Sequence, residues 1–407
     1  MDRQAIDVKR ALLGRQPKVQ EDNKGVGYAT RLLSMYKKNP SALSDSPPSG
    51  PNSGYIVLLD EEAQSYSCFG LAKDNRILDF PFPQNKNLII NYSVGENSHS
   101  EEAMFLPVLN QPLSSNRYYV IRMKGKNQGQ VNTSSKEEDM TTCLCCSFFN
   151  DVKPRSLEPL NDYQQVEIIK TGYGFRAKSV ASDGILSGIL REKGWTVDAS
   201  TPRNYHLSQA LGSNDSLRSK QPNFDFPLSN DRSESIIVGK WYCPFVFVKE
   251  GMKLKEQMKM SLFYELTLEQ RWEKIFSKEN GNNGEVNVLI DVLIPTEVVK
   301  VGGKDAVCWD ENRLVDGVLL FKSVDQDVGL SLEVVEGMKW EQQRFGWIAG
   351  NGRQVRVTNV EEFDGTKKWK KFSCYVLVES FVLRRMDGRL VLSYDFRHSH
   401  QIRSKWE

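Results

Sequence analysis

The C-terminal stretch SCYVLVESFVLRRMDGRLVLSYDFRHSHQIRSKW (Ser373–Trp406) decides the fold class, because it reads as one long β-hairpin. Its Asp387-Gly388 dipeptide is the strongest short-range signal for a two-residue hairpin turn. After the turn, apolar and polar residues alternate from Leu390 to Arg403, which is the period of a strand with one buried face. The stretch therefore predicts antiparallel β-sheet.

Two of the chain's four histidines lie on the apolar face of this hairpin. Counting cross-strand pairs outward from the turn places Glu379 opposite Phe396 and Tyr375 opposite His400. Glu379 is then a diagonal neighbour of His398, within reach of a hydrogen bond. We therefore expect Glu379, His398 and His400 to share one face of the sheet.

The types of these three residues leave several chemical interpretations open. A carboxylate and two imidazoles can bind Zn²⁺ or another divalent metal, and they can also transfer protons. Polar groups on an apolar face are usually hydrogen-bonded to each other, and such a cluster can simply fix the strand register. We favour the structural interpretation, so no cofactor is predicted.

A second candidate is the cysteine cluster Cys143, Cys145 and Cys146. Zinc sites usually need two such pairs, and the other cysteines are isolated in the sequence. Free cysteine often packs as a small apolar residue. Core thiols are therefore favoured, with redox sensing or metal binding as the alternatives.

Composition describes a globular protein with no strong electrostatic preference. The 407 residues include 54 Lys and Arg against 52 Asp and Glu, a net charge of +2, with 39% hydrophobic residues. This balance gives no general attraction to nucleic acid or anionic membrane. No apolar run approaches the roughly 20 residues of a membrane-spanning helix, and the N-terminus lacks the apolar region of a secretory signal. With seven cysteines, an odd number, we expect a reducing compartment, the cytoplasm or the nucleus.

The chain divides into three parts. We expect a disordered tail over residues 1–27, an N-terminal β-rich domain over 28–230 and a C-terminal α+β domain over 231–407. The boundary rests on the polar, proline-interrupted residues 212–235. Residues 253–264 alternate as a strand with one polar face. Short helices are expected at 31–36, 185–192, 205–211, from Thr267 onward and at 329–345. The predicted fold class is α+β, mostly antiparallel sheets with a few short helices in two β-rich halves.

Six runs of the sequence together resemble one known family. They are Tyr28–Pro40, Gly50–Tyr55, Phe80–Leu88, Val238–Phe245, Leu268–Glu273 and Tyr394–Arg403. The family is a plant family catalogued as domain of unknown function 1262, and the resemblance extends over about residues 28–407. It implies a plant origin and, by analogy, a role in stress or defence. It supplies no catalytic residues, because the family has no established activity.

Two further stretches suggest binding surfaces. Lys367-Lys368-Trp369-Lys370-Lys371 interleaves an aromatic ring with lysines, which suits nucleic acid or anionic lipid, although a solvated loop is commoner. Trp241–Phe245 is typical of core, with Pro244 marking an edge or a bulge. A concave aromatic pocket near Pro244 would hold a small apolar ligand.

These observations favour a non-catalytic binding or interaction protein whose partners are other proteins, without specific nucleic-acid binding. Two alternatives stay open. A membrane-acting, toxin-like protein needs a helical bundle or a long amphipathic hairpin rich in Ser and Thr, which the sequence does not show. An enzyme would use an unlisted site around Glu379, His398 and His400.

Overall fold

The computed structural model shows a mostly β protein, with 49% of the described residues in strands. The α+β prediction was therefore wrong, because several segments predicted as helices form strands or irregular backbone. The predicted tail at residues 1–27 lies outside the described residues. The structure describes residues 31–44, 57–59, 65–67, 72–108, 111–143, 146–203, 205–210, 212–281, 286–308, 317–350, 352–365 and 368–407.

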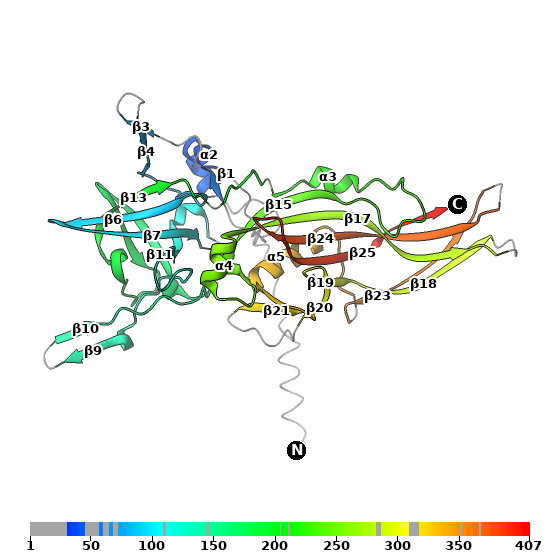
Figure 1. The fold of residues 1–407 in the computed structure, drawn as a ribbon. Coiled ribbons are helices and arrows are strands. Elements are labelled where there is room, and N and C mark those ends of the chain that lie inside the picture. The colour runs from blue at the N-terminus through cyan, green and yellow to red at the C-terminus, as the bar shows by residue number, and fades with distance from the viewer. Residues whose placement is uncertain are drawn as a thin grey trace, which may run out of the picture.

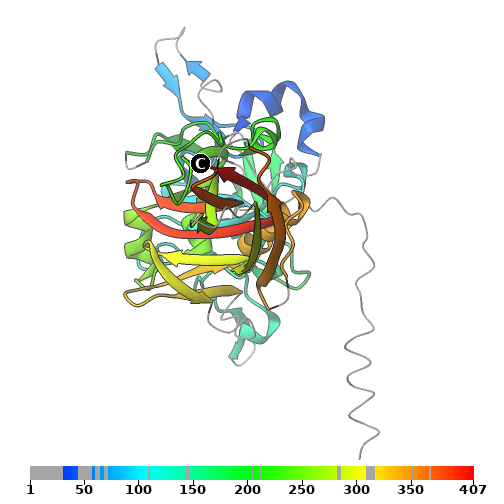
Figure 2. The same ribbon diagram turned by 90° about the vertical axis from the view of Figure 1, so that its right-hand side faces the viewer.

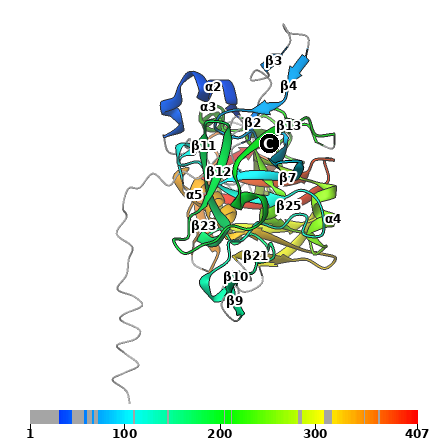
Figure 3. The same ribbon diagram turned by 90° about the vertical axis from the view of Figure 1, so that its left-hand side faces the viewer.

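The first large sheet has seven strands and lies at the left of Figure 1. Figure 3 shows it from its own end of the molecule. Neighbouring strands are antiparallel. In order across the sheet, the strands are β12 (Gly174–Ser179), β11 (Gln165–Thr171), β8 (Arg117–Arg122), β7 (Asn97–Pro107), β6 (Asn87–Val94), β13 (Lys193–Ser200) and β5 (Arg76–Ile77).

The second large sheet has ten strands and contains the longest ones, β17 and β25, of 17 residues each. These run toward the end of the molecule where the C-terminus lies, which faces the viewer in Figure 2. In order across the sheet, the strands are β14 (Gly212–Ser213), β15 (Ile236–Pro244), β17 (Phe263–Glu279), β24 (Lys371–Arg385), β25 (Leu390–Trp406), β19 (Glu297–Val301), β20 (Lys304–Cys308), β21 (Val318–Lys322), β22 (Asp327–Ser331) and β16 (Val248–Lys249).

The remaining elements are short. Four two-stranded sheets pair β1 (Arg31–Leu32) with β2 (Leu58–Leu59), β3 (Ser65–Ser67) with β4 (Ala72–Asp74), β9 (Met140–Cys143) with β10 (Cys146–Phe149), and β18 (Asn287–Pro295) with β23 (Gln354–Glu362). The described α-helices are α2 (Leu33–Lys38), α3 (Asp215–Lys220), α4 (Leu254–Met260) and α5 (Leu332–Arg344). The 3₁₀ turns are η1 (Pro40–Leu43), η2 (Leu113–Ser115), η3 (Glu137–Asp139), η4 (Asp162–Gln164), η5 (Gly188–Arg191) and η6 (Phe245–Phe247). Among the described residues, no helix is both long and apolar enough to cross a membrane.

The terminal hairpin forms, with two departures from the predicted register. The Arg385 N–H donates to the Arg389 carbonyl at 2.9 Å, so residues 386–388 make a three-residue loop. Gly388 takes the left-handed conformation, φ +86°, that this loop type requires. Farther out, β24 and β25 keep the expected register as far as His398. A bulge at residues 399–401 of β25 then shifts it, so that Tyr375 pairs with Arg403 and not with His400.

Helix and strand were exchanged in the middle of the chain. Residues predicted as a polar-faced strand form α4, and the helix predicted from Thr267 is part of β17. β17 lies between β15 and β24, and these pairings outweigh the local helical signals. The helix expected at 185–192 reduces to η5, and in place of the one expected at 205–211 the described residues 205–210 form irregular backbone. The helix expected at 329–345 is confirmed as α5, although residues 329–331 belong to β22.

One hydrophobic core joins the two large sheets. It contains buried side chains from β7 and β8 as well as from β15, β17, β24 and β25. The two halves approach closely at Gly129, where a Cβ atom would lie 3.1 Å from Leu254 Cγ and 3.3 Å from Phe245 Cε2. A division of the chain at residue 230 stays a prediction. The seven-stranded sheet uses residues 76–200, and the ten-stranded sheet uses residues 212–406.

Candidate functional site

The structure brings two of the three predicted cluster residues together. Glu379 on β24 pairs with Phe396, and His398 on β25 pairs with Leu377. Both polar side chains are fully buried, and His398 Nε2 lies 3.6 Å from Glu379 Oε2. His398 Nε2 also lies 2.9 Å from Gln342 Oε1 on α5.

The central residue of this cluster is Arg218 on α3, which sequence reasoning missed. Its guanidinium is fully buried and grips Glu379 with two nitrogens, Nε donating to Oε1 at 2.8 Å and Nη2 pairing with Oε2. The third nitrogen, Nη1, pairs with the buried Glu341. The guanidinium also stacks over the ring of Phe345, with Cζ 4.0 Å from the ring centroid. Arg218 thus joins α3, α5 and β24.

The carboxylate of Glu379 is fully occupied by partners. Gln270 Nε2 donates a further hydrogen bond to Glu379 Oε1 at 2.7 Å. Burial alone would raise the pKa of Glu379, but the hydrogen bonds from Arg218 and His398 outweigh it and lower this pKa to about 2. A carboxylate that is ionised, fully paired and without solvent exposure cannot contact a substrate. Its arrangement suits a structural role, and we call this buried cluster of Arg218, Gln270, Glu341, Glu379 and His398 the clasp.

His400 does not join this clasp. It lies in the bulge of β25 and is exposed, with its ring centroid 5.5 Å from that of His398. Partial burial, followed by the nearby His398, lowers the pKa of His400. Within the described part of the chain, no group of three or more His, Cys, Asp or Glu side chains is placed to hold a metal ion.

The other sequence candidates take ordinary positions. Cys143 ends β9 and Cys146 begins the antiparallel β10, whereas Cys145 lies outside the described residues. In the lysine-rich stretch, Trp369 is 3% exposed and packs 5.1 Å from Trp406, between centroids. The ring is therefore not available for stacking on a nucleobase.

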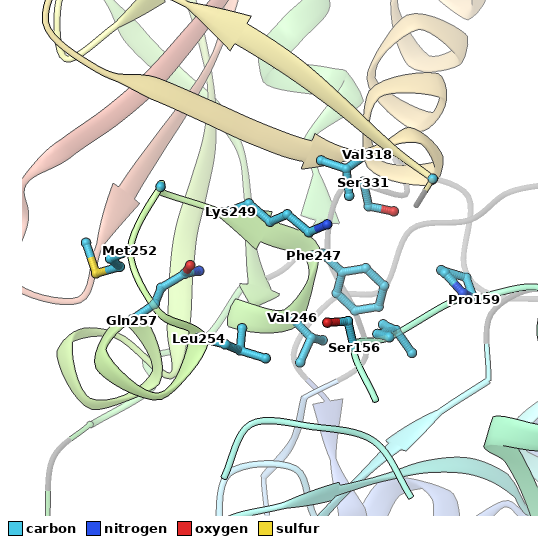
Figure 4. A pocket seen from close by; sticks show the side chains of 13 residues that line it. Ser156, Pro159, Val246, Phe247, Lys249, Met252, Leu254, Gln257, Val318 and Ser331 are labelled. Atoms are coloured by element: carbon cyan, nitrogen blue, oxygen red, sulfur yellow. The ribbon is translucent and has the colours of Figure 1, made fainter. Parts of the chain in front are cut away.

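A mostly apolar pocket lies between the two halves, shown in Figure 4, with a volume of about 280 Å³. It lies beside the Trp241–Phe245 stretch. Most of its described lining is apolar, and the polar contributions come from two serines, Gln257 and Lys249. The lining residues are Ser156, Leu157, Pro159, Val246, Phe247, Lys249, Gly251, Met252, Leu254, Gln257, Gly317, Val318 and Ser331.

Gln257 on α4 holds one wall of this pocket in shape. Its side-chain Nε2 donates to the carbonyls of Phe245 and Val248, at 3.1 and 2.6 Å, and its Oε1 accepts from the Glu250 N–H at 3.3 Å. One buried amide thus satisfies three backbone groups of the 245–250 loop, which lacks regular sheet partners over most of its length.

A second anchor holds the far end of the same loop. Arg385 Nη2 donates to Glu250 Oε2 at 2.6 Å, and the Tyr264 hydroxyl donates to Glu250 Oε1 at 2.5 Å. Burial, followed by the Glu250 hydrogen bond, raises the pKa of Tyr264, so its hydroxyl stays protonated and able to donate. The next residue, Gly251, turns with φ +72°, a conformation that glycine adopts without strain.

The centre of the pocket is mainly apolar. Figure 4 shows Phe247, Val246 and Ser156 around its centre, with the Lys249 side chain extending across it from β16. An apolar wall with few polar groups and one ammonium is the usual character of a small-ligand site. In the sequence, the Trp241–Phe245 stretch indicated the region beside this pocket. The contributions from residues 156–159 and 317–331 are distant in sequence and had no signal there.

Comparison with known proteins gives a limited match. No functionally curated protein matches the chain. The solved structure titled "Crystal structure of Cry35Ab1" aligns with 80% of this chain and 90% of its own, at 11% sequence identity and a TM-score of 0.43. Residues 49–147, about a quarter of the chain, match the sequence model of the family described as "Protein of unknown function (DUF1262)", which supports the predicted family resemblance.

Proposed function

We propose that this protein is a non-catalytic binding protein, and that the pocket between its two halves takes a small, mainly apolar ligand. The observation that carries the proposal is the pocket lining, most of which is apolar. Its volume of about 280 Å³ is just below the roughly 300–1,000 Å³ typical of ligand pockets, which suits a small ligand.

The buried cluster supports the non-catalytic part of this proposal. A catalytic group must reach its substrate, whereas Glu379 and His398 are both 0% exposed. The carboxylate is also bound by Arg218 and Gln270, which leaves it no free role as a base. A role in plant stress or defence stays a prediction from the family resemblance. A cytoplasmic or nuclear location stays a prediction from the odd number of cysteines.

The pocket can be tested with the fluorescent probe 1-anilinonaphthalene-8-sulfonate, which combines aromatic rings with one sulfonate. We expect saturable binding of one probe per chain. Ser156→Phe should abolish it, because Ser156 is exposed at the pocket and a larger side chain there fills the space. Leu160→Ser is the matched control, since Leu160 is 89% exposed nearby but outside the lining.

An apolar ligand without charge provides a second test. Decanol should displace the probe from the pocket, because most of the lining is apolar. Undiminished probe binding in Ser156→Phe, or no displacement by decanol, would overturn the proposed site.

A further inference from the structure

The two-stranded sheet of β18 and β23 lies at the end of the molecule opposite the seven-stranded sheet (Figure 1). Its inner face is well packed. Val288, Ile290 and Ile294 of β18 are buried in a hydrophobic cluster that includes Phe372 and Val376 of β24. This packing holds the pair firmly against the ten-stranded sheet and fixes which side of β18 faces outward.

β18 has an edge with no strand neighbour among the described strands. The Phe363 N–H donates to the Val286 carbonyl at 2.9 Å, and the Thr296 N–H donates to the Arg353 carbonyl at 2.8 Å. In an antiparallel pair, hydrogen-bonded positions recur at every second residue. Even-numbered residues of β18 therefore bond to β23, and the N–H and C=O groups of Leu289, Asp291 and Leu293 point to the open edge.

The side chains along this edge favour pairing with another strand. Leu289 is 59% exposed and Leu293 is 60% exposed. Natural edge strands usually carry lysine or other charges that block such pairing, and β18 carries Asp291 as its only charged residue. That charge is neutralised within the chain, because Arg356 on β23 donates Nε to Asp291 Oδ1 at 2.6 Å and Nη2 to Oδ2 at 2.5 Å.

We propose that β18 pairs in antiparallel fashion with β18 of a second copy of this chain, which makes one continuous four-stranded sheet across a two-fold axis. With the axis at Asp291, Leu289 of each copy faces Leu293 of the other, and the outward backbone groups are in hydrogen-bonding register. A second copy fits better than an unrelated strand, because the edge is self-complementary under this symmetry. The two Asp291 carboxylates meet at the axis, and the negative charge of each is offset by the Arg356 of its own copy.

Matched lysine variants can distinguish pairing along the edge of β18 from apolar contact through the exposed face of the β18–β23 sheet. Leu289 and Val360 are cross-strand partners with 59% and 60% exposure, but Leu289 lies on the pairing edge and Val360 lies on the far strand. Sedimentation equilibrium of the full chain should show wild type reaching twice the chain mass of 46.4 kDa. Leu289→Lys should weaken the dimer by at least about tenfold, and Val360→Lys should leave it intact.

The charge arrangement gives an independent test. Arg356→Ala frees the Asp291 carboxylates to repel each other across the axis, so the dimer should weaken by several-fold. Adding Asp291→Asn to this variant should restore the dimer, because it removes the two carboxylates that repel each other. Circular dichroism of each variant confirms that the fold is retained. A wild type that stays monomeric at all concentrations, a dimer that survives Leu289→Lys, or one that Val360→Lys disrupts equally would overturn the edge pairing.

Discussion

At the scale of single residues, the buried clasp around Arg218 decides how the outer segment that contains α3 is attached to the sheet. Arg218 is 0% exposed and lies 161 positions from Glu379 in the sequence. Removal of one partner of a buried ion pair typically costs about 3–5 kcal/mol, because the other charge stays buried and unpaired. The clasp therefore makes the attachment of α3 depend on the ionisation of Glu379.

Acid should weaken the protein through Glu379. Its pKa is about 2 in the folded protein against an ordinary value of 4.5, so its contribution is complete above pH 4.5 and is lost as the pH falls toward 2. Between pH 6 and pH 3, wild type should lose about 2 kcal/mol more unfolding free energy than Glu379→Gln, measured by urea denaturation. Glu362→Gln, at an exposed carboxyl of β23, is the control. Equal losses of unfolding free energy in wild type and Glu379→Gln would contradict a stabilising role for the ionised Glu379.

Two thiols are buried among the described side chains, and they should resist alkylation in the folded protein. Cys243 and Cys374 are both 0% exposed, and burial raises the pKa of each thiol, that of Cys374 to about 11. Because the thiolate is the reactive form, iodoacetamide should modify these two only after denaturation. Peptide mass spectrometry at fixed times measures this. Modification of either residue at the same rate in the native and denatured protein would refute its burial.

At the scale of elements, the terminal hairpin was predictable and the centre of the chain was not. Asp387-Gly388 and the alternation after it gave the pairing from Leu383 to His398, because register there depends on local pattern. Nothing local signals the bulge at 399–401. In β17, the spacing of Leu268 and Trp272 fits a helix as well as the two-residue period of a strand. Only the pairing with neighbouring strands decides which of the two structures forms. Arg218 and the far wall of the pocket depend on contacts between distant segments, which one sequence does not display.

The loop that forms the pocket wall should depend on Gln257. Gln257→Leu keeps most of the side-chain volume but leaves the carbonyls of Phe245 and Val248 without a donor. We expect the unfolding free energy to fall by about 1–3 kcal/mol and probe binding to weaken. Glu256→Gln, at the exposed neighbouring position, should change neither. If Gln257→Leu binds the probe as wild type does, the loop does not need this amide.

At the scale of the whole molecule, two sheets share one core and leave a pocket where they meet. The core joins side chains of β7 and β8 with those of β15 and β17, and Gly129 permits the close approach to α4. The pocket draws its lining from residues 156–159, 246–257 and 317–331, so it exists only when both halves are in place. A ligand there should stabilise the junction, because binding to the folded state alone shifts the unfolding equilibrium.

Hydrogen–deuterium exchange of the full chain, with and without saturating 1-anilinonaphthalene-8-sulfonate, tests the central claim most directly, because it locates the bound probe on the backbone. The account predicts slower exchange in peptides that cover residues 245–257 and 317–331. It predicts no change in residues 287–295 of β18, whose side chains Leu289 and Leu293 are exposed and apolar but lie outside the pocket. Protection confined to β18, or no protection at the junction under saturating probe, would contradict the pocket as the binding site.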